Sequence, residues 1–317
     1  MSLAVLYTGG TIGGSRVGRG AVARARSALD FGRLARGGLP AGAPPFTVRG
    51  ALGKLSENLE PGDWGVLARE VDVLVRGGAT GIVLAHGTDT LIFTACALRW
   101  LLPGLPIPVA VTGSRLPLSE PGTDAVRNLE LALVVAGQSR RPGVWVVFSG
   151  LPGAAGRVLD PLDARKEAGR WDCFQPVWGR PAGRVAAGSN RVTWQRPAAK
   201  AEAYAPRFEV DPRPVLFMMH PGFRPDWIRQ AARRGVRGIV LAGYGSGTAC
   251  AEGPFDLRPA VKESVGRGVP VWMVSQHGGR VEAAYGSTVG LVKAGLRLMP
   301  GWTPEAALTA LMCGAAV

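Results

Sequence analysis

Short apolar runs alternate with longer segments of mixed polarity along most of the chain. Four runs in the first half are apolar throughout, as parallel strands covered on both faces should be: 3–7, 81–86, 107–113 and 144–150. The segments between them predict helices that open at Pro61, at Thr88 or Asp89, and near Gly122: 61–77, 89–102 and 122–137. Strands followed repeatedly by helices predict an α/β fold with a parallel sheet.

The pattern is interrupted at 191–212, where proline, alanine and charged residues mix, and this segment is predicted to be a linker. After it, the predicted strands are 214–220, 238–245 and 269–276, with helices near 225–234 and 257–267 and two closing helical segments, the last opening at Thr303. We therefore expect a larger N-terminal domain over 1–190, with a mostly parallel Rossmann- or flavodoxin-like sheet. A smaller α/β domain with a parallel sheet should occupy 213–317, and 317 residues suit two domains better than one.

The formal net charge of +14 raises the question of a nucleic-acid partner, because clustered cations release counterions from phosphates. The arginines are instead spread along the whole chain, and only five cationic residues are lysines. This distribution is typical of a compositional preference for arginine. We expect no nucleic-acid partner, although a basic face would still attract anionic substrates.

The four cysteines are far apart and show no CxxC pairing, so they suit buried apolar positions better than a disulfide framework or a metal site: Cys96, Cys173, Cys250 and Cys313. No apolar run reaches the roughly 18–20 residues of a membrane helix, and the first residues are strand-like rather than typical of a leader. We expect no metal, no membrane association and a cytoplasmic location.

Two predicted strands end in turns that carry hydroxyl groups, "TGGTI" at 8–12 and "HGTDT" at 86–90. The first is not a phosphate loop, because its glycines do not fit GxGxxG and no GK[ST] ending follows. A threonine on a glycine turn would instead expose its hydroxyl beside backbone N–H groups, as a nucleophile requires. Taken alone, the first turn is better explained as a plain strand end. The second turn adds a hydroxyl and a carboxylate, and neighbouring strands would bring both turns to one pocket.

Together the two motifs resemble those of the bacterial-type asparaginase and glutaminase family, which are threonine amidohydrolases. The segments "LSENLEPGDW" at 55–64 and 109–133 also resemble parts of that family, as does the predicted smaller domain. The resemblance implies hydrolysis of L-asparagine to L-aspartate and ammonia through a threonine acyl-enzyme, with no cofactor. It also implies glutaminase-asparaginase or D-amino-acid amidase activity as alternatives.

The same resemblance implies that Thr11 is the primary nucleophile and that Thr88, Asp89 and Lys166 form a second constellation. In an arginine-rich chain, a lysine suggests a position where a removable proton matters. For Lys166 to act as a base near neutral pH, burial must overcome the attraction of Asp89 for an ammonium group. Otherwise Lys166 orients Thr88 and stabilises charge. Both alternatives remain open.

Substrate-binding residues also follow from the resemblance. Ser56 and Glu57 correspond to groups that hold the substrate's α-carboxylate and α-ammonium, and Asp89 is the other acidic partner of the ammonium. Gly10 and Thr88 also belong to this set. An amino-acid substrate does need an anion for its ammonium and donors for its carboxylate. "SEN" before a helix that opens with proline would also serve as a simple helix entry.

The sequence departs from the family pattern in two places. The family has a tyrosine in the loop after the first threonine, whereas the four tyrosines here are Tyr7, Tyr204, Tyr244 and Tyr285. The family also completes each site from a neighbouring subunit, within a homodimer or homotetramer. The family commonly uses an asparagine after the "GxG" turn there, where this sequence has Thr248, and a downstream glutamate, for which Glu282 is the candidate.

Two further classes of function remain compatible with the sequence. One is a module like the tRNA-dependent amidotransferase partner of archaea, although such chains carry an additional N-terminal domain. The other is a non-catalytic protein that binds amino acids on the same scaffold. His86 precedes a glycine at a strand end, and we expect it to be a hydrogen-bonded structural residue rather than a base.

Overall fold

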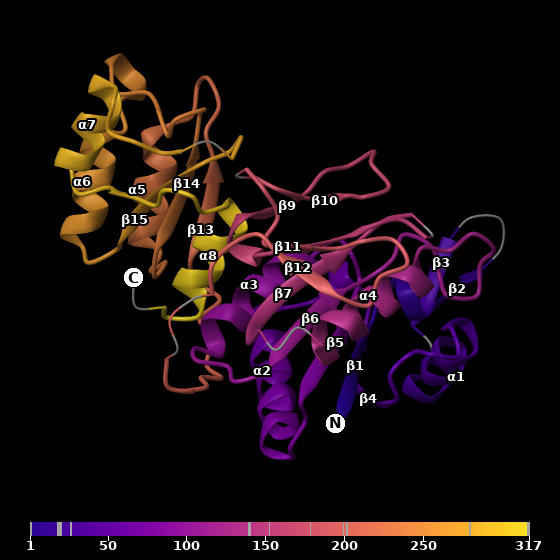
Figure 1. The fold of residues 1–317 in the computed structure, drawn as a ribbon. Coiled ribbons are helices and arrows are strands. Elements are labelled where there is room, and N and C mark those ends of the chain that lie inside the picture. Colours follow the sequence, from indigo (N-terminus) through magenta and orange to yellow (C-terminus); the bar gives the residue numbers. More distant parts are fainter. Residues whose placement is uncertain are drawn as a thin grey trace. The chain divides into compact units, whose positions relative to one another are not determined.

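The computed structural model describes residues 2–17, 21–25, 27–138, 141–151, 153–177, 179–198, 200, 202–278 and 280–315, with side chains at 16, 17 and 21–25 left out. The chain divides into two compact units, Met1–Glu209 and Val210–Val317. Each unit is a sheet with helices packed on it (Figure 1). The predicted two-part α/β fold is confirmed.

Among the described residues of the first unit, the main sheet has eight strands in the order β12-β11-β8-β7-β6-β5-β1-β4. The strands that run parallel are β1 (Leu3–Gly9), β4 (Phe46–Lys54), β5 (Gly81–Ala85), β6 (Pro108–Thr112) and β7 (Gly143–Phe148). Antiparallel pairings add β8 (Gly156–Leu159), β11 (Gly183–Val185) and β12 (Val192–Trp194). The four predicted strands of this half are therefore present, and every residue of β1, β5 and β6 is buried.

The helices of the first unit lie on the sheet as follows: α1 (Ala28–Gly38) and α4 (Ala125–Gln138) pack over the face of β1 that carries Leu3, Val5 and Tyr7, whereas α2 (Pro61–Arg76) and α3 (Leu91–Leu101) contact each other. Glu60 and Asp63 form a capping box that starts α2 at Pro61, as predicted. α3 begins two residues later than the expected 89, which leaves Thr88 and Asp89 in the preceding turn.

Short elements connect these layers. The segment after Thr11, where the resemblance implied a loop, contains an antiparallel pair of strands, β2 (Gly14–Val17) and β3 (Ala21–Ala25). A second small pair is β9 (Ala164–Lys166) with β10 (Phe174–Pro176). Single 3-10 turns complete the unit: η1 (Thr11–Gly13), η2 (Ser56–Asn58) and η3 (Pro161–Asp163).

The structure differs from the predicted boundary at the start of the expected linker 191–212. Strand β12 lies inside that segment and pairs with β11, and its Trp194 packs on Trp145 with ring centroids 4.8 Å apart. Three residues are too short a run for a periodicity to indicate a strand. The first few residues of 191–212 therefore belong to the larger sheet.

The second unit is built on a parallel sheet whose described strands follow the order β13-β14-β15-β16: β13 (Val215–Met218), β14 (Ile239–Gly243), β15 (Val271–Ser275) and β16 (Arg297–Leu298). Its helices are α5 (Pro225–Arg233), α6 (Arg258–Gly266), α7 (Gly286–Lys293) and α8 (Pro304–Met312), with the turn η4 (Gly253–Phe255). Thr303 caps α8 by accepting from the Ala306 N–H at 3.1 Å, as its sequence predicts. Within the described parts of both units, no helix combines the length and apolar character needed to cross a membrane.

Candidate active site

The two glycine turns meet backbone to backbone at one edge of the larger sheet. β1 and β5 are adjacent parallel strands, so the turns that follow them lie side by side. Gly10 has a φ of +79°, and a Cβ there would overlap the backbone of Gly87. Gly9 is also in the left-handed region, where its backbone lies against Lys54. Glycine is therefore required for the contact between the two motifs.

The two threonines of the first turn occupy different environments. Thr8 is buried, and its hydroxyl donates to the Ala85 carbonyl at 3.1 Å, which ties β1 to β5. Thr11 opens η1 and is only half-buried. Thr8 therefore has a structural role, whereas Thr11 is the more accessible of the two threonines.

Lys166 joins the second turn through its ammonium group. Its Nζ donates to Thr88 Oγ1 at 3.0 Å and to Asp89 Oδ1 at 2.6 Å, although 78 and 77 residues separate it from them in the sequence. The side chains of Lys166 and Asp89 are 31% and 61% exposed, so the pair lies at the surface of the site rather than deep inside it. An ammonium has three donors and no acceptor, and in this arrangement Lys166 orients the Thr88 hydroxyl.

The chain positions Lys166 through the short segment η3–β9. Asp160 starts it by accepting from the Leu162 N–H at 3.0 Å, and Asp163 ends η3 in an ion pair with Arg196 at 2.5 Å. Burial raises the pKa of Asp163 to about 6, against the opposing attraction of Arg196. In β9, Lys166 pairs with Phe174 of β10, and this register directs the lysine toward the second turn.

Ser56 reaches the second turn from η2. It is 3% exposed, its Oγ accepts from the Asp89 N–H at 3.3 Å, and its carbonyl accepts from Thr90 Oγ1 at 2.8 Å. A Cβ on Gly87 would come within 2.5 Å of Ser56 Oγ. The neighbouring Glu57 is exposed. The structure thus brings Ser56, Thr88, Asp89 and Lys166 together.

Residues 2–199 match the family model described as Asparaginase, N-terminal, and residues 215–316 match the Glutaminase/Asparaginase C-terminal domain. The two matches follow the two units of the fold. The chain belongs to the asparaginase family. As an asparaginase-family chain, it carries the two motifs in the two turns that meet at Gly10 and Gly87.

Relatives of this asparaginase-family chain support the same assignment. It is 35% identical over 316 residues to the L-asparaginase of Thermococcus kodakarensis, covering 98% of this chain and 92% of that protein. A solved structure of the thermostable L-asparaginase from that organism superposes with a TM-score of 0.86 at 33% identity, over 99% of this chain and 92% of the other. L-asparaginase I from Vibrio cholerae gives 0.81 at 27% identity, over 98% and 91%.

A second group of relatives consists of subunits of glutamyl-tRNA(Gln) amidotransferases. The subunit from Pyrobaculum aerophilum is 32% identical over 245 residues, which cover 76% of this chain. The matched part is 57% of that relative's length. The corresponding protein from Methanopyrus kandleri is also 32% identical, over 84% of this chain and 59% of its own length.

A tyrosine does lie next to the first turn, but it comes from the strand before it. The Tyr7 ring stacks on Phe31 with centroids 4.4 Å apart, and a Cβ on Gly13 would overlap the Tyr7 hydroxyl. Tyr7 therefore lies beneath the η1 turn, on the core side. The alternation of side chains along a strand could have predicted this position, because it places Tyr7 on the same buried face of β1 as Leu3 and Val5.

Sequence reasoning missed Asn128, which holds the loop beside Thr88. Its Nδ2 donates to the Gly113 carbonyl and to Asp124, both at 3.0 Å, and its Oδ1 accepts from the Ser149 N–H at 2.8 Å. A Cβ on Gly113 would lie 3.3 Å from the Thr88 methyl group. Burial raises the pKa of Asp124, which also accepts backbone N–H groups of this loop. A buried asparagine within an apolar helix was the available signal.

His86 is buried with both ring nitrogens bonded. Nδ1 lies 2.6 Å from the Gly87 carbonyl and Nε2 lies 3.0 Å from Thr94 Oγ1. A carbonyl only accepts, so Nδ1 carries the proton and Nε2 accepts from the Thr94 hydroxyl. Burial lowers the pKa of His86 to about 4. This geometry agrees with the expected structural role.

Thr248 and Glu282 lie at one edge of the second unit, in the turns after β14 and β15. The Thr248 carbonyl accepts from the Tyr244 N–H at 2.9 Å, and the Glu282 N–H donates to the Ser246 carbonyl at 3.2 Å. Their proximity follows from the adjacent parallel strands β14 and β15. Glu282 is exposed and Thr248 half-buried.

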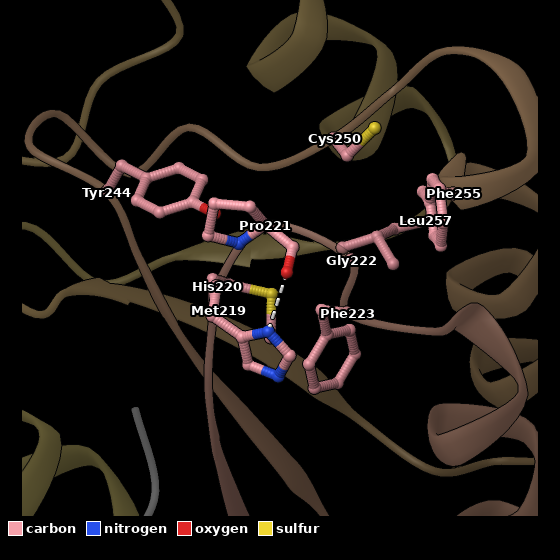
Figure 2. Close-up of a pocket in the computed structure, with 9 residues that line it drawn as sticks. All are labelled: Met219, His220, Pro221, Gly222, Phe223, Tyr244, Cys250, Phe255 and Leu257. Carbon is pink, nitrogen blue, oxygen red and sulfur yellow. Dashed lines mark hydrogen bonds between the residues drawn. The ribbon is translucent and has the colours of Figure 1, made fainter.

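The second unit holds a cavity of about 110 Å³, and Figure 2 shows the residues that line it, His220, Tyr244 and mostly apolar side chains. His220 Nδ1 lies 2.9 Å from the Pro221 carbonyl. Ligand pockets usually measure about 300–1,000 Å³, so this cavity is too small for most ligands. Cys250 at its rim is exposed, which corrects the expectation that all four cysteines suit buried positions.

Proposed function

We propose that this chain hydrolyses L-asparagine to L-aspartate and ammonia through an acyl-enzyme on Thr11. One observation carries the proposal. Lys166 bonds to Thr88 and Asp89 in the second turn, and that turn contacts the turn that carries Thr11. A nucleophile and a second, oriented hydroxyl within one site form the arrangement that acyl transfer requires. The names of the L-asparaginase relatives support the choice of substrate.

In the first step, Thr11 Oγ attacks the carboxamide carbon, and a C–O bond forms as the carbonyl becomes an oxyanion. Backbone N–H groups of the glycine turn are available to stabilise that charge. The C–N bond then breaks, and the nitrogen leaves as ammonia after taking up one proton, which balances the proton that Thr11 loses. Water attacks the resulting ester, which releases aspartate and restores the Thr11 hydroxyl.

We assign the protonation of the leaving nitrogen to Thr88, Asp89 and Lys166. Lys166 donates to Thr88 Oγ1 at 3.0 Å, so the Thr88 hydroxyl keeps its own proton for donation to the leaving nitrogen. Lys166 then gives a proton to Thr88, and the proton that Thr11 released returns Lys166 to its ammonium form. Asp89, at 2.6 Å, holds the lysine in place. This role favours orientation and charge stabilisation over a permanently neutral lysine.

The substrate's amino-acid end would be held by the groups around η2. Asp89 and the exposed Glu57 supply negative charge for the α-ammonium, while Ser56 and backbone donors near Gly10 suit the α-carboxylate. Asp89 contacts Lys166 through Oδ1 only, which leaves Oδ2 for the substrate. We propose these four residues, together with Thr88, as the substrate-binding set.

The test is ammonia release from L-asparagine by the purified chain. Thr11→Ala, Thr88→Val and Lys166→Met should each lower turnover at least 100-fold while leaving the circular dichroism spectrum unchanged. Thr193→Val and Lys262→Met are matched controls at exposed positions and should retain wild-type rates. Turnover within twofold of wild type in Thr88→Val or Lys166→Met would disprove the second constellation.

A second candidate is glutaminase activity, favoured by the amidotransferase relatives. Comparing kcat/KM for L-asparagine, L-glutamine and D-asparagine separates the specificities. Binding of asparagine in calorimetry without ammonia release above the Thr11→Ala background would instead indicate a non-catalytic binding protein.

We also propose that the chain assembles as a homodimer or homotetramer and lies in the cytoplasm. Thr248 and Glu282 would then approach the site of a neighbouring subunit. Sedimentation velocity tests the assembly, and cell fractionation tests the location. Thr248→Ala or Glu282→Ala should raise KM for asparagine without changing the sedimentation coefficient, and an unchanged KM in both would remove these residues from the site.

A further inference from the structure

The first unit holds a second cavity, of about 550 Å³, away from the glycine turns. Its walls include the end of α3 and the start of β7, with residues 104–106, 196–198, 200 and 202. The glycine turns follow the carboxyl ends of β1 and β5, whereas this cavity lies where β6 and β7 begin. It is therefore at the opposite edge of the same sheet, and it has the volume of a small-molecule site.

Cations outnumber anions around this cavity. Arg99, Arg141, Arg196 and Lys200 line it, against Asp160 and Glu202. Asp160 is already occupied as the N-cap of η3. The cavity thus has an excess of positive charge that an anionic ligand would neutralise.

Arg141 packs beside two tryptophans that contact each other. Its guanidinium carbon lies 4.3 Å from the centroid of the Trp194 ring and 5.8 Å from that of Trp145, and its Nη2 donates to the Arg196 carbonyl at 2.7 Å. Burial lowers the pKa of Arg141, because the charged form is partly desolvated. A preorganised guanidinium of this kind binds carboxylate or phosphate with little loss of side-chain freedom.

The rest of the lining is mostly apolar, including Leu102, Leu105, Val144 and Trp145. We propose that this cavity binds an organic anion with an apolar or aromatic body, whose carboxylate or phosphate faces the arginines. Inorganic phosphate alone would leave the apolar wall uncovered. This inference does not depend on the proposed function, because binding is measured without turnover.

Two structural links connect the cavity with Lys166. α3 begins beside Thr88 and Asp89 and reaches Arg99 eight residues later, about 12 Å along its axis. Arg196 holds Asp163 at 2.5 Å, three residues before Lys166. An anion that attracts Arg196 competes with Asp163 and shifts β9, so occupancy of the cavity should alter turnover at the site.

Isothermal titration calorimetry tests the site with matched pairs of probes. AMP should bind at least tenfold more tightly than adenosine, or phenylacetate more tightly than 2-phenylethanol, and the tighter pair identifies phosphate or carboxylate. Equal affinity within both pairs, or no heat from any anion, would overturn the proposal.

The double variant Arg99→Gln/Lys200→Gln should weaken anion binding at least tenfold. Arg33→Gln/Lys262→Gln removes the same two charges at exposed positions elsewhere and should leave binding unchanged. Equal weakening in both double variants would indicate only a general charge effect and would refute the site.

The link to Lys166 has its own readout. Saturating anion should change kcat for asparagine at least twofold in the wild type and not in Arg99→Gln/Lys200→Gln. An unchanged kcat with intact binding would overturn the link but not the site. Failure of the proposed function would appear separately, as absent ammonia release without any anion.

Discussion

His86 offers a direct test of how burial affects the turn that carries Thr88. Its side chain is 0% exposed and both ring nitrogens are bonded within the protein. Burial lowers its pKa from 6.5 to about 4. Since each unit of pKa corresponds to about 1.4 kcal/mol, protonating His86 costs about 3 kcal/mol more in the folded protein than in the unfolded chain.

The sign follows from proton binding. Between pH 6.5 and 4 the unfolded chain binds a proton that the folded protein does not, so the free energy of unfolding falls as the pH falls. His86 therefore contributes up to about 3 kcal/mol of stability above pH 6.5 that is lost by pH 4. The neutral Nδ1–H form should persist in the folded protein at pH 5.

Two measurements check this prediction. Long-range ¹H–¹⁵N spectra distinguish the ring forms directly, and with three histidines in the chain, His86 is assigned by its loss in His86→Asn. In urea unfolding, His86→Asn should be less stable than wild type at pH 7.5, and this deficit should shrink by about 3 kcal/mol at pH 4. A folded-state midpoint near 6.5, or a deficit independent of pH, would refute the reasoning.

Three further predictions follow from the same contacts. Burial raises the pKa of Asp163 to about 6, so its stabilising contribution is present below about pH 4 and is lost as the pH rises through 6. In urea unfolding, the stability of Asp163→Asn should therefore rise relative to wild type by up to about 3 kcal/mol between pH 4 and 7. A difference in stability that does not change with pH would contradict this prediction. Gly10→Ala should lose at least tenfold in asparagine turnover with unchanged circular dichroism, because φ is +79° and the new methyl group overlaps Gly87; a wild-type rate would show that this turn tolerates displacement. Asn128→Leu leaves the buried Gly113 carbonyl and Ser149 N–H without a partner and should lower the unfolding free energy by about 3 kcal/mol, whereas a loss below about 0.5 kcal/mol would mean that water replaces the amide.

The sequence alone determined the elements whose physics is local. Uninterrupted apolar runs predict buried parallel strands, and β1, β5 and β6 lie within the predicted ranges or extend at most two residues beyond them. Helix starts could also be predicted, because they depend on residues next to the helix. Pro61 is the first residue of α2, and the Thr303 side chain caps the first turn of α8. The two motifs were visible because each lies within five consecutive residues.

Edge strands were not readable. Residues 46–54 form β4 with alternating, mostly partial exposure, and their pairing with β1 depends on a neighbour more than 40 residues away. Strand β12 is too short to show a period, and only its pairing with β11 reveals it. In both cases partner strands, rather than local preference, decide the conformation.

The candidate site divides in the same way. Residue types in the two turns indicated a hydroxyl nucleophile, but the 3.0 Å contact of Lys166 with Thr88 joins residues 78 positions apart. The resemblance suggested that pair, and only the return of the chain through η3 and β9 brings it into contact. Likewise, Tyr7 lies beneath Gly13 because β1 faces α1 at that residue. Local sequence fixes which groups a turn exposes, whereas strand order and register fix which distant groups meet there, because these depend on the packing of the whole unit.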